Sequence, residues 1–147
     1  MLIKKDEIIK ANLRLHKARE DYRSAKTLLE KGLYRAANDR AYFCMYHAAN
    51  AVCALDGVNP KYGVSVRNYF KLRCADSTLL PGFIDPYLCE ILEYAAKSRF
   101  SVNFDDCYAV GKKETLINVE NAEIFLEAIE NFAAQRVKCE YTADDCE

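Results

Sequence analysis

The apolar run at residues 41–55 limits the possible folds of this chain more than any other feature. Its only strongly polar side chains are those of His47 and Asn50, with further hydroxyl groups on Tyr42 and Tyr46. A helix through this run is apolar around nearly its whole circumference, and such a helix has to be buried on more than one side. The sequence therefore predicts a helix at the centre of a bundle, or on a bundle face that a second subunit covers.

The segments on either side of this run are also helical in pattern. Residues 6–31 have an apolar repeat every seven positions with alanines between the large residues, which is typical of a bundle helix packed closely against a neighbour. The central helix is expected over residues 33–56, because Gly32 and Gly57 are suited to positions where helices end. The other predicted ranges are a short helix over 65–75, a helix over 86–100, a loop over 101–113 and a helix over 114–138.

The same periodicity predicts which side chains form the core. In the first helix these are Ile8, Ala11, Leu15, Ala18, Tyr22, Ala25 and Leu29, and in the second they are Met45, Ala48, Val52 and Leu55. In the later helices they are Leu88, Ile91, Leu92 and Ala95, followed by Ile117, Ala122 or Ile124, Phe125, Ala128, Ile129 and Phe132. No segment has the two-residue alternation of a solid strand. We therefore expect an all-α, up-and-down bundle of about five helices.

The length of 147 residues is that of one ordinary domain. We expect a single unit over residues 1–147, with a core at about 6–138 and a frayed acidic tail at 139–147. The formal net charge of −1 provides no overall field to recruit nucleic acid, which argues against a tight nonspecific binder but not against a local site.

The seven cysteines are odd in number, widely spaced and without a Cys-x-x-Cys pair. This pattern supports neither a metal knuckle nor a redox motif, and a chain able to build its own core does not need a disulfide framework. Cys44, Cys53 and Cys89 are expected to be small core residues. The N-terminus lacks the apolar region of a signal peptide, and no stretch has the length of a membrane span. We expect a cytoplasmic protein with no membrane partner and no cofactor.

Arg40 and His47 are the candidate functional residues within the central helix. Seven steps of about 100° return to within roughly 20° of the start, so the two side chains share one helix face about two turns apart. The positions within about 60° of Arg40 are mostly small, which predicts close approach by another helix or a narrow cleft. These flanking positions are Ala36, Phe43, Cys44, Ala51 and Ala54.

The chemistry of this pair fits the cleavage of RNA without a metal ion. Arginine offers a permanent positive charge and a planar set of donors suited to phosphate. Histidine has an ordinary pKa of about 6.5 and can move a proton near neutral pH. A base could remove the proton of a ribose 2′-hydroxyl group, which attacks the neighbouring phosphate, while a cation stabilises the developing charge.

A purely structural role for the pair is the competing interpretation. Arg40 could form an ion pair near Asp39 or with Asp105 and Asp106, and His47 could be a core histidine bound by Asn50 or a backbone carbonyl. The second histidine, His16, and the charged residues at 14–26 are expected to form a solvated face of the first helix.

The string from Gly32 to Ala49, GLYRAANDRAYFCMYHAA, resembles the signature of the HEPN family of small helical proteins. The resemblance extends over about residues 10–133. Other stretches that carry it are Asp21-Tyr22 through Leu28-Leu29, Asn59-Pro60-Lys61, Arg99 with Asp105-Asp106, and Phe125 to Ile129.

This resemblance implies a helical bundle that forms a homodimer with helix two near the interface. It also implies an Arg-(four to six residues)-His motif that carries metal-independent endoribonuclease activity in many members and faces a cleft shared by the two subunits. Here the motif corresponds to Arg40 and His47. Apart from the resemblance, we expect Asn50, one turn after His47, to orient it, and Asp39 to be a further supporting residue. Many members are toxins encoded beside a minimal nucleotidyltransferase that neutralises them. The leading hypothesis is therefore the toxin component of a toxin–antitoxin pair, with RNA as its substrate and such a nucleotidyltransferase as its antitoxin.

Two other hypotheses remain open at this stage. The first is a non-catalytic HEPN module that binds a nucleotide or a nucleotidyltransferase, which is favoured by the neutral charge and by Ala41, where active members often carry a polar residue. One toxin branch has a tyrosine where this chain has Ala49, so the neutralisation linked to that tyrosine is not implied here. The second is a bundle that serves only as an assembly part, with Arg40 and His47 inaccessible.

Overall fold

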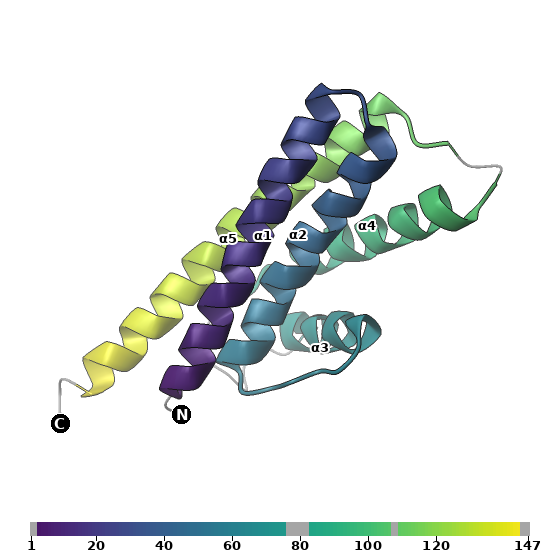
Figure 1. Ribbon diagram of the computed structural model, residues 1–147. Helices are drawn as coiled ribbons and strands as arrows, with labels where there is room; N and C mark the ends of the chain where they lie inside the picture. The colour runs from purple at the N-terminus through teal and green to yellow at the C-terminus, as the bar shows by residue number, and fades with distance from the viewer. Residues whose placement is uncertain (1–2, 76–82, 107–108, 145–147) are drawn as a thin grey trace.

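The computed structural model describes residues 3–75, 83–106 and 109–144, with side chains described as far as Lys138. This part of the chain contains helices and no strand. The helices are α1 (Lys5–Glu30), α2 (Tyr34–Leu55), α3 (Gly63–Ala75), α4 (Pro86–Phe104) and α5 (Lys112–Asp144) (Figure 1). The prediction of an all-α bundle is therefore confirmed.

Helix α2 is the central element of the fold. It contacts each of the other four helices, with α1 and α5 running alongside it and the shorter α3 and α4 extending on another side (Figure 1). The predicted core residues Met45, Ala48, Val52 and Leu55 are all buried. The apolar run is thus covered largely by helices of the same chain.

The ends of the helices follow from local chemistry. Gly32 and Gly57, directly after α1 and α2, have φ angles of +75° and +73°, a conformation that side chains with a Cβ rarely adopt. At the start of α4, the Asp85 carboxylate accepts a hydrogen bond from the Tyr87 backbone N–H at 3.0 Å, and Pro86 occupies the first turn. The predicted ends of α1 and α2 and the predicted start of α4 were therefore close to the observed ones.

Most of the inward positions predicted for helix α5 are confirmed, among them Phe125, Ile129 and Phe132, but its first turns differ from the prediction. Ile117 and Ile124 are exposed, while Thr115 and Asn118 are buried. The inward position of Ile117 was therefore wrong, and Ala122 rather than Ile124 belongs to the core. The helix also continues to Asp144, beyond the predicted end at Lys138, and residues 145–147 lie outside the described part.

A buried polar network explains why Asn118, and not Ile117, faces inward. Asn118 in α5 donates to Asn38 Oδ1 in α2 and to Ser98 Oγ in α4, and Asn38 Nδ2 donates to the same Ser98 oxygen at 3.2 Å. Ser98 in turn donates to Glu114 at 2.8 Å. Because buried polar groups need partners, α5 turns its amide inward and leaves Ile117 at the surface.

A second buried polar centre lies at the C-terminal end of α2. The buried carboxylate of Asp56 accepts hydrogen bonds from Tyr69 Oη at 2.7 Å, from Arg73 Nε at 2.9 Å and from Arg136 Nη1. Arg73 and Arg136 are buried as well. This centre ties the end of α2 to α3 and α5.

The cysteines behave as the pattern predicts where the structure describes them. Cys44, Cys53 and Cys74 are buried free thiols, and Cys89 is partly buried against the core. Burial raises the pKa of Cys53 and of Cys74 to about 12 each, so these thiols are protonated at neutral pH. The remaining cysteines, at positions 107, 139 and 146, lie outside the described side chains.

Candidate functional site

The candidate site lies on a stripe of α2 that its own chain leaves partly open. Ala36 is exposed, and Arg40, Phe43, His47 and Asn50 are half-buried, while the rest of the helix between Ala37 and Asp56 is mostly buried. These five residues follow one another at helical spacing, so they lie on one face, as predicted. The small residues beside them, Cys44, Ala51 and Ala54, are buried within the chain, which agrees with the predicted close approach of another helix.

Asp21 of α1 joins the two predicted residues. Its Oδ1 accepts a hydrogen bond from Arg40 Nη1 at 2.9 Å, and its Oδ2 lies 3.6 Å from His47 Nε2. The Asp21 side chain is 14% exposed, against 41% for Arg40 and 24% for His47. One largely buried carboxylate therefore holds the charged and the titratable side chain together. The suggestion that Arg40 pairs near Asp39 or with residues 105–106 was wrong.

The surroundings of His47 lower its pKa below the ordinary value of 6.5. Burial is the largest cause, because it penalises the charged imidazolium. The nearby positive charges of Lys17, Arg40 and Arg14 act in the same direction, and the carboxylate of Asp21 opposes them without reversing the shift. His47 is therefore neutral at neutral pH and able to accept a proton.

Phe43 provides an aromatic platform beside this pair. The guanidinium carbon of Arg40 lies 4.9 Å from the centre of the Phe43 ring, and that of Arg99 in α4 lies 4.8 Å from the same centre. Arg99 also stacks over Tyr42 at 5.3 Å. Two arginines from different helices thus stack on one ring, which orients both guanidinium groups.

The two predicted supporting residues occupy other surroundings. Asp39 faces α4, where its Oδ1 accepts a hydrogen bond from Asn103 Nδ2 at 2.7 Å and lies 3.9 Å from Arg99 Nε. The backbone oxygen of Asn50 accepts a hydrogen bond from Arg14 at 2.9 Å, and its Oδ1 is buried without a partner in the described part of the chain. The structure thus brings Asp21 to His47, and an orienting role for Asn50 stays a prediction.

Sequence reasoning missed Asp21 and Arg99 as site residues, although a signal for Asp21 was present. Asp21 follows Ala18 by three positions and precedes Ala25 by four, and both alanines are fully buried. A carboxylate on the inward face of an amphipathic helix needs a partner from another element. Arg99 gave no comparable signal, because nothing in α4 indicates which helix its side chain meets.

The remaining charged residues of α1 were predicted to be solvated. This is confirmed for His16, which is exposed and lies 3.2 Å from the exposed Glu20. It was wrong for Arg14, which reaches α2, and for Arg19, which binds Glu130 of α5 at 2.8 Å.

Neither a metal-binding cluster nor a membrane-spanning helix is present among the described residues. No group of three or more His, Cys, Asp and Glu side chains there is placed to hold a metal ion. Among the helices of that part, none is long and apolar enough to cross a membrane.

Comparison with known proteins identifies the family. The HEPN domain model matches residues 11–132. A UPF0332 protein of Pyrococcus horikoshii is 32% identical over 104 residues, which cover 70% of this chain and 70% of that protein. A protein of Methanocaldococcus jannaschii named "Putative toxin" is 29% identical over 112 residues, covering 76% of this chain and 80% of that protein. The chain, with its five helices and its Arg40–His47 pair on α2, belongs to the HEPN domain family.

Proposed function

We propose that this protein is an endoribonuclease that uses Arg40 and His47 to cleave RNA without a metal ion. The observation that carries the proposal is the shared carboxylate of Asp21, which holds a permanent cation and a neutral imidazole side by side at a partly open surface. Membership of the HEPN family and the resemblance of the Arg40–His47 spacing to the family motif support it.

In this mechanism His47 acts as the general base. Its neutral imidazole removes the proton of a ribose 2′-hydroxyl group, and the resulting oxygen attacks the adjacent phosphorus. The bond to the 5′-oxygen of the next nucleotide breaks, leaving a 2′,3′-cyclic phosphate, and the departing oxygen takes up the proton of the His47 imidazolium, directly or through a water molecule. The protein thereby returns to its starting protonation state.

Arg40 stabilises the negative charge that develops on the phosphate. Only one of its five N–H groups donates to a described residue, the one that binds Asp21. The others remain available for phosphate oxygens, and charge-assisted hydrogen bonds of this kind are among the strongest in proteins.

A cleavage assay in EDTA tests the proposal. Wild-type protein should cleave single-stranded RNA, whereas His47→Ala and Arg40→Gln should each lose about 100-fold or more in rate. His16→Ala is the matched control for the histidine, because His16 is exposed on α1, and Arg23→Gln is the control for the arginine. If His47→Ala cleaves as fast as the wild type with an unchanged melting temperature, the proposed catalytic role of His47 is wrong.

The cellular role that we propose is that of a toxin whose antitoxin is a nucleotidyltransferase. The name of the Methanocaldococcus relative and the family resemblance support it. Expression of the wild type should arrest growth, expression of His47→Ala should not, and co-expression of a minimal nucleotidyltransferase from a neighbouring reading frame should restore growth. Arrest by both forms would contradict a role based on RNA cleavage.

A non-catalytic module that binds a nucleotide is the second candidate function. It is favoured by the ion pair with Asp21, which already offsets the charge of Arg40, and by the limited exposure of His47. A rise in melting temperature with added nucleotide, without any cleavage of RNA, would support this candidate over the first.

A further inference from the structure

A cleft between α2, α3 and α4 lies next to the candidate site and has no role in the mechanism above. Its volume is about 460 Å³, and its lining includes three cationic side chains, Arg67, Lys97 and Arg99, together with the rings of Tyr42 and Phe100. No carboxylate is among the residues that line it. Three cations against the one carboxylate paired with Arg99, that of Asp39, leave an excess of positive charge here in a chain whose net charge is −1.

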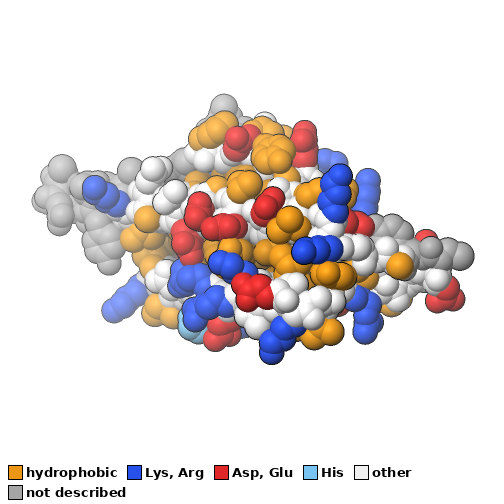
Figure 2. All heavy atoms as spheres, turned by 90° about the horizontal axis from the view of Figure 1, so that it is seen from above, with side chains coloured by type: hydrophobic (Ala, Val, Ile, Leu, Met, Phe, Trp, Pro, Cys, Tyr) orange, Lys and Arg blue, Asp and Glu red, His pale blue; other side chains and the backbone are white. Residues whose placement is uncertain are grey.

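The face of the molecule that is seen from above does not share this character. The view from above shows Lys and Arg side chains interspersed with Asp and Glu side chains (Figure 2). The cleft differs from this mixed surface because it is basic and has aromatic walls. Cations and aromatic rings together are the usual means by which proteins hold a nucleic acid strand.

The two arginines of the cleft have donors that no described residue uses. Arg67 Nε and Arg99 Nε are both buried and lack a hydrogen-bond partner within the described part of the chain. Arg99 Nε lies 3.9 Å from Asp39 Oδ1, which is too long for a hydrogen bond. Buried donors without acceptors are unfavourable, so a ligand that supplies acceptor oxygens would relieve this cost.

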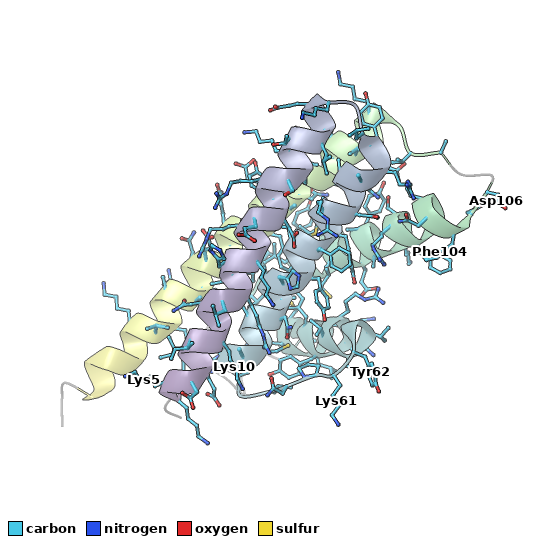
Figure 3. The ribbon with its side chains drawn as sticks, in the orientation of Figure 1. Lys5, Lys10, Lys61, Tyr62, Phe104 and Asp106 are labelled. Atoms are coloured by element: carbon cyan, nitrogen blue, oxygen red, sulfur yellow. The ribbon has the colours of Figure 1, made fainter. Side chains whose placement is uncertain are left out.

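The cleft is also continuous with the candidate site. Arg40 and Arg99 both stack on the Phe43 ring, at 4.9 and 4.8 Å from its centre, so their guanidinium carbons lie within about 10 Å of each other. On the outer side, Phe100 and Phe104 are exposed and their ring centres are 5.1 Å apart. Phe104 lies at the end of α4 that projects from the bundle (Figure 3).

We propose that this cleft binds a second phosphate group of the RNA strand, adjacent to the one on which Arg40 and His47 act. Arg67 and Arg99 donate to its oxygens, Lys97 adds charge at the rim, and Phe100 stacks on a neighbouring base. This inference rests on the proposed function, because it takes RNA as the substrate. It assigns to α3 and α4 the task of holding the strand while α1 and α2 carry the reacting groups.

The test measures RNA binding separately from cleavage. A fluorescein-labelled single-stranded RNA of about 12 nucleotides is titrated in EDTA against His47→Ala, which leaves the cleft intact, and anisotropy gives the affinity. Adding Arg67→Gln should weaken RNA binding about tenfold. It should also make the slope of log K against the logarithm of the salt concentration shallower by about 0.7, the value for one lost phosphate contact on a single strand. Arg23→Gln, which removes an equal charge from the exposed flank of α1, should change both much less.

The outcomes separate this inference from the function on which it rests. If the parent binds RNA and neither Arg67→Gln nor Arg99→Gln weakens it, the cleft is not an RNA subsite and the ribonuclease proposal stands. If wild-type protein neither binds nor cleaves RNA, both proposals fail. Equal affinity for adenosine monophosphate and for the oligonucleotide would overturn the assignment to a strand. If Arg99→Gln lowers the melting temperature, the result for Arg67→Gln decides, because the buried Nε of Arg67 has no hydrogen-bond partner in the described part of the chain.

Discussion

Asp21 contacts both residues of the candidate site, Arg40 and His47, through its carboxylate. Its carboxylate raises the pKa of His47, against the lowering effects of burial and of Lys17, Arg40 and Arg14. Replacing Asp21 by asparagine keeps the shape of the side chain and removes the charge. The pKa of His47 should then fall further below 6.5.

This change has a defined effect on the pH dependence of cleavage. A general base works in its unprotonated form, so activity is present above the pKa of His47 and is lost as the pH falls through it. In Asp21→Asn the acid limb of kcat/KM should therefore move to lower pH, while the maximum falls because Arg40 loses its partner. A proton NMR titration of the His47 ring checks the direction independently of activity, and an upward shift would contradict it.

Asp56 holds together the end of the bundle at which α2 meets α3 and α5. Asp56→Asn leaves the buried guanidinium groups of Arg73 and Arg136 without the carboxylate that binds them both. We expect a loss of about 3–5 kcal/mol in the free energy of unfolding, as for other broken buried ion pairs. Urea unfolding measures it, and Asp106→Asn at an exposed loop position should cost less than about 0.5 kcal/mol. Similar losses in the two variants would mean that the centre contributes little.

The sequence allowed us to predict which residues share a face of one helix, but not which residues pair between two helices. The common face of Arg40 and His47 follows from the helical repeat alone. The partner of Arg40 depends on how α1 is rotated against α2, which no local pattern of α2 contains. Asp21 therefore became visible as a site residue only in the packed structure.

Three helices meet at the polar network around Ser98, and this network should set their relative positions. Ser98→Ala removes the oxygen that accepts from Asn38 and Asn118 and the hydroxyl that donates to Glu114. Because buried amides are left with fewer partners, the free energy of unfolding should fall by about 1–3 kcal/mol. Chemical denaturation measures the loss, with Ser24→Ala on the exposed side of α1 as the control. A loss no larger than that of the control would show that the network is dispensable.

The elements themselves were largely predictable from periodicity and capping residues. The apolar spacing located all five helices, and the two glycines after α1 and α2 marked their ends. The errors fell where polar contacts override hydrophobic spacing. Helix α4 continues to Phe104, past the predicted end at residue 100, and Asn103 in that added turn donates to Asp39 and to the Arg99 carbonyl oxygen. Such contacts have no signature in the apolar pattern.

At the scale of the whole molecule, the open stripe of α2 allows a direct test of the proposed homodimer. If two copies pair through this stripe, Ala36→Arg places a large cation in the interface, because Ala36 is exposed on α2 next to Arg40 in the stripe. We expect the wild type to sediment as a dimer and Ala36→Arg to shift toward the monomer. Ala134→Arg, at an exposed alanine of α5, is the matched control. A wild type that is monomeric at all concentrations would contradict pairing through α2.

The sequence separations of the two charged centres have a consequence for how the protein forms. The hydrogen bond between Asp21 and Arg40 spans 19 positions of the chain, whereas the one between Asp56 and Arg136 spans 80. Contacts between near neighbours close short loops and form early, while distant ones wait for the rest of the chain. During synthesis, the α1–α2 hairpin, which carries Asp21, Arg40 and His47, is made first. Helix α5 is made last, and only then can Arg136 bind Asp56 at the end of α2. We therefore expect the geometry of the Arg40–His47 pair to be established before global stability, so that in hydrogen-exchange pulse labelling the amides of this hairpin become protected ahead of those of α5.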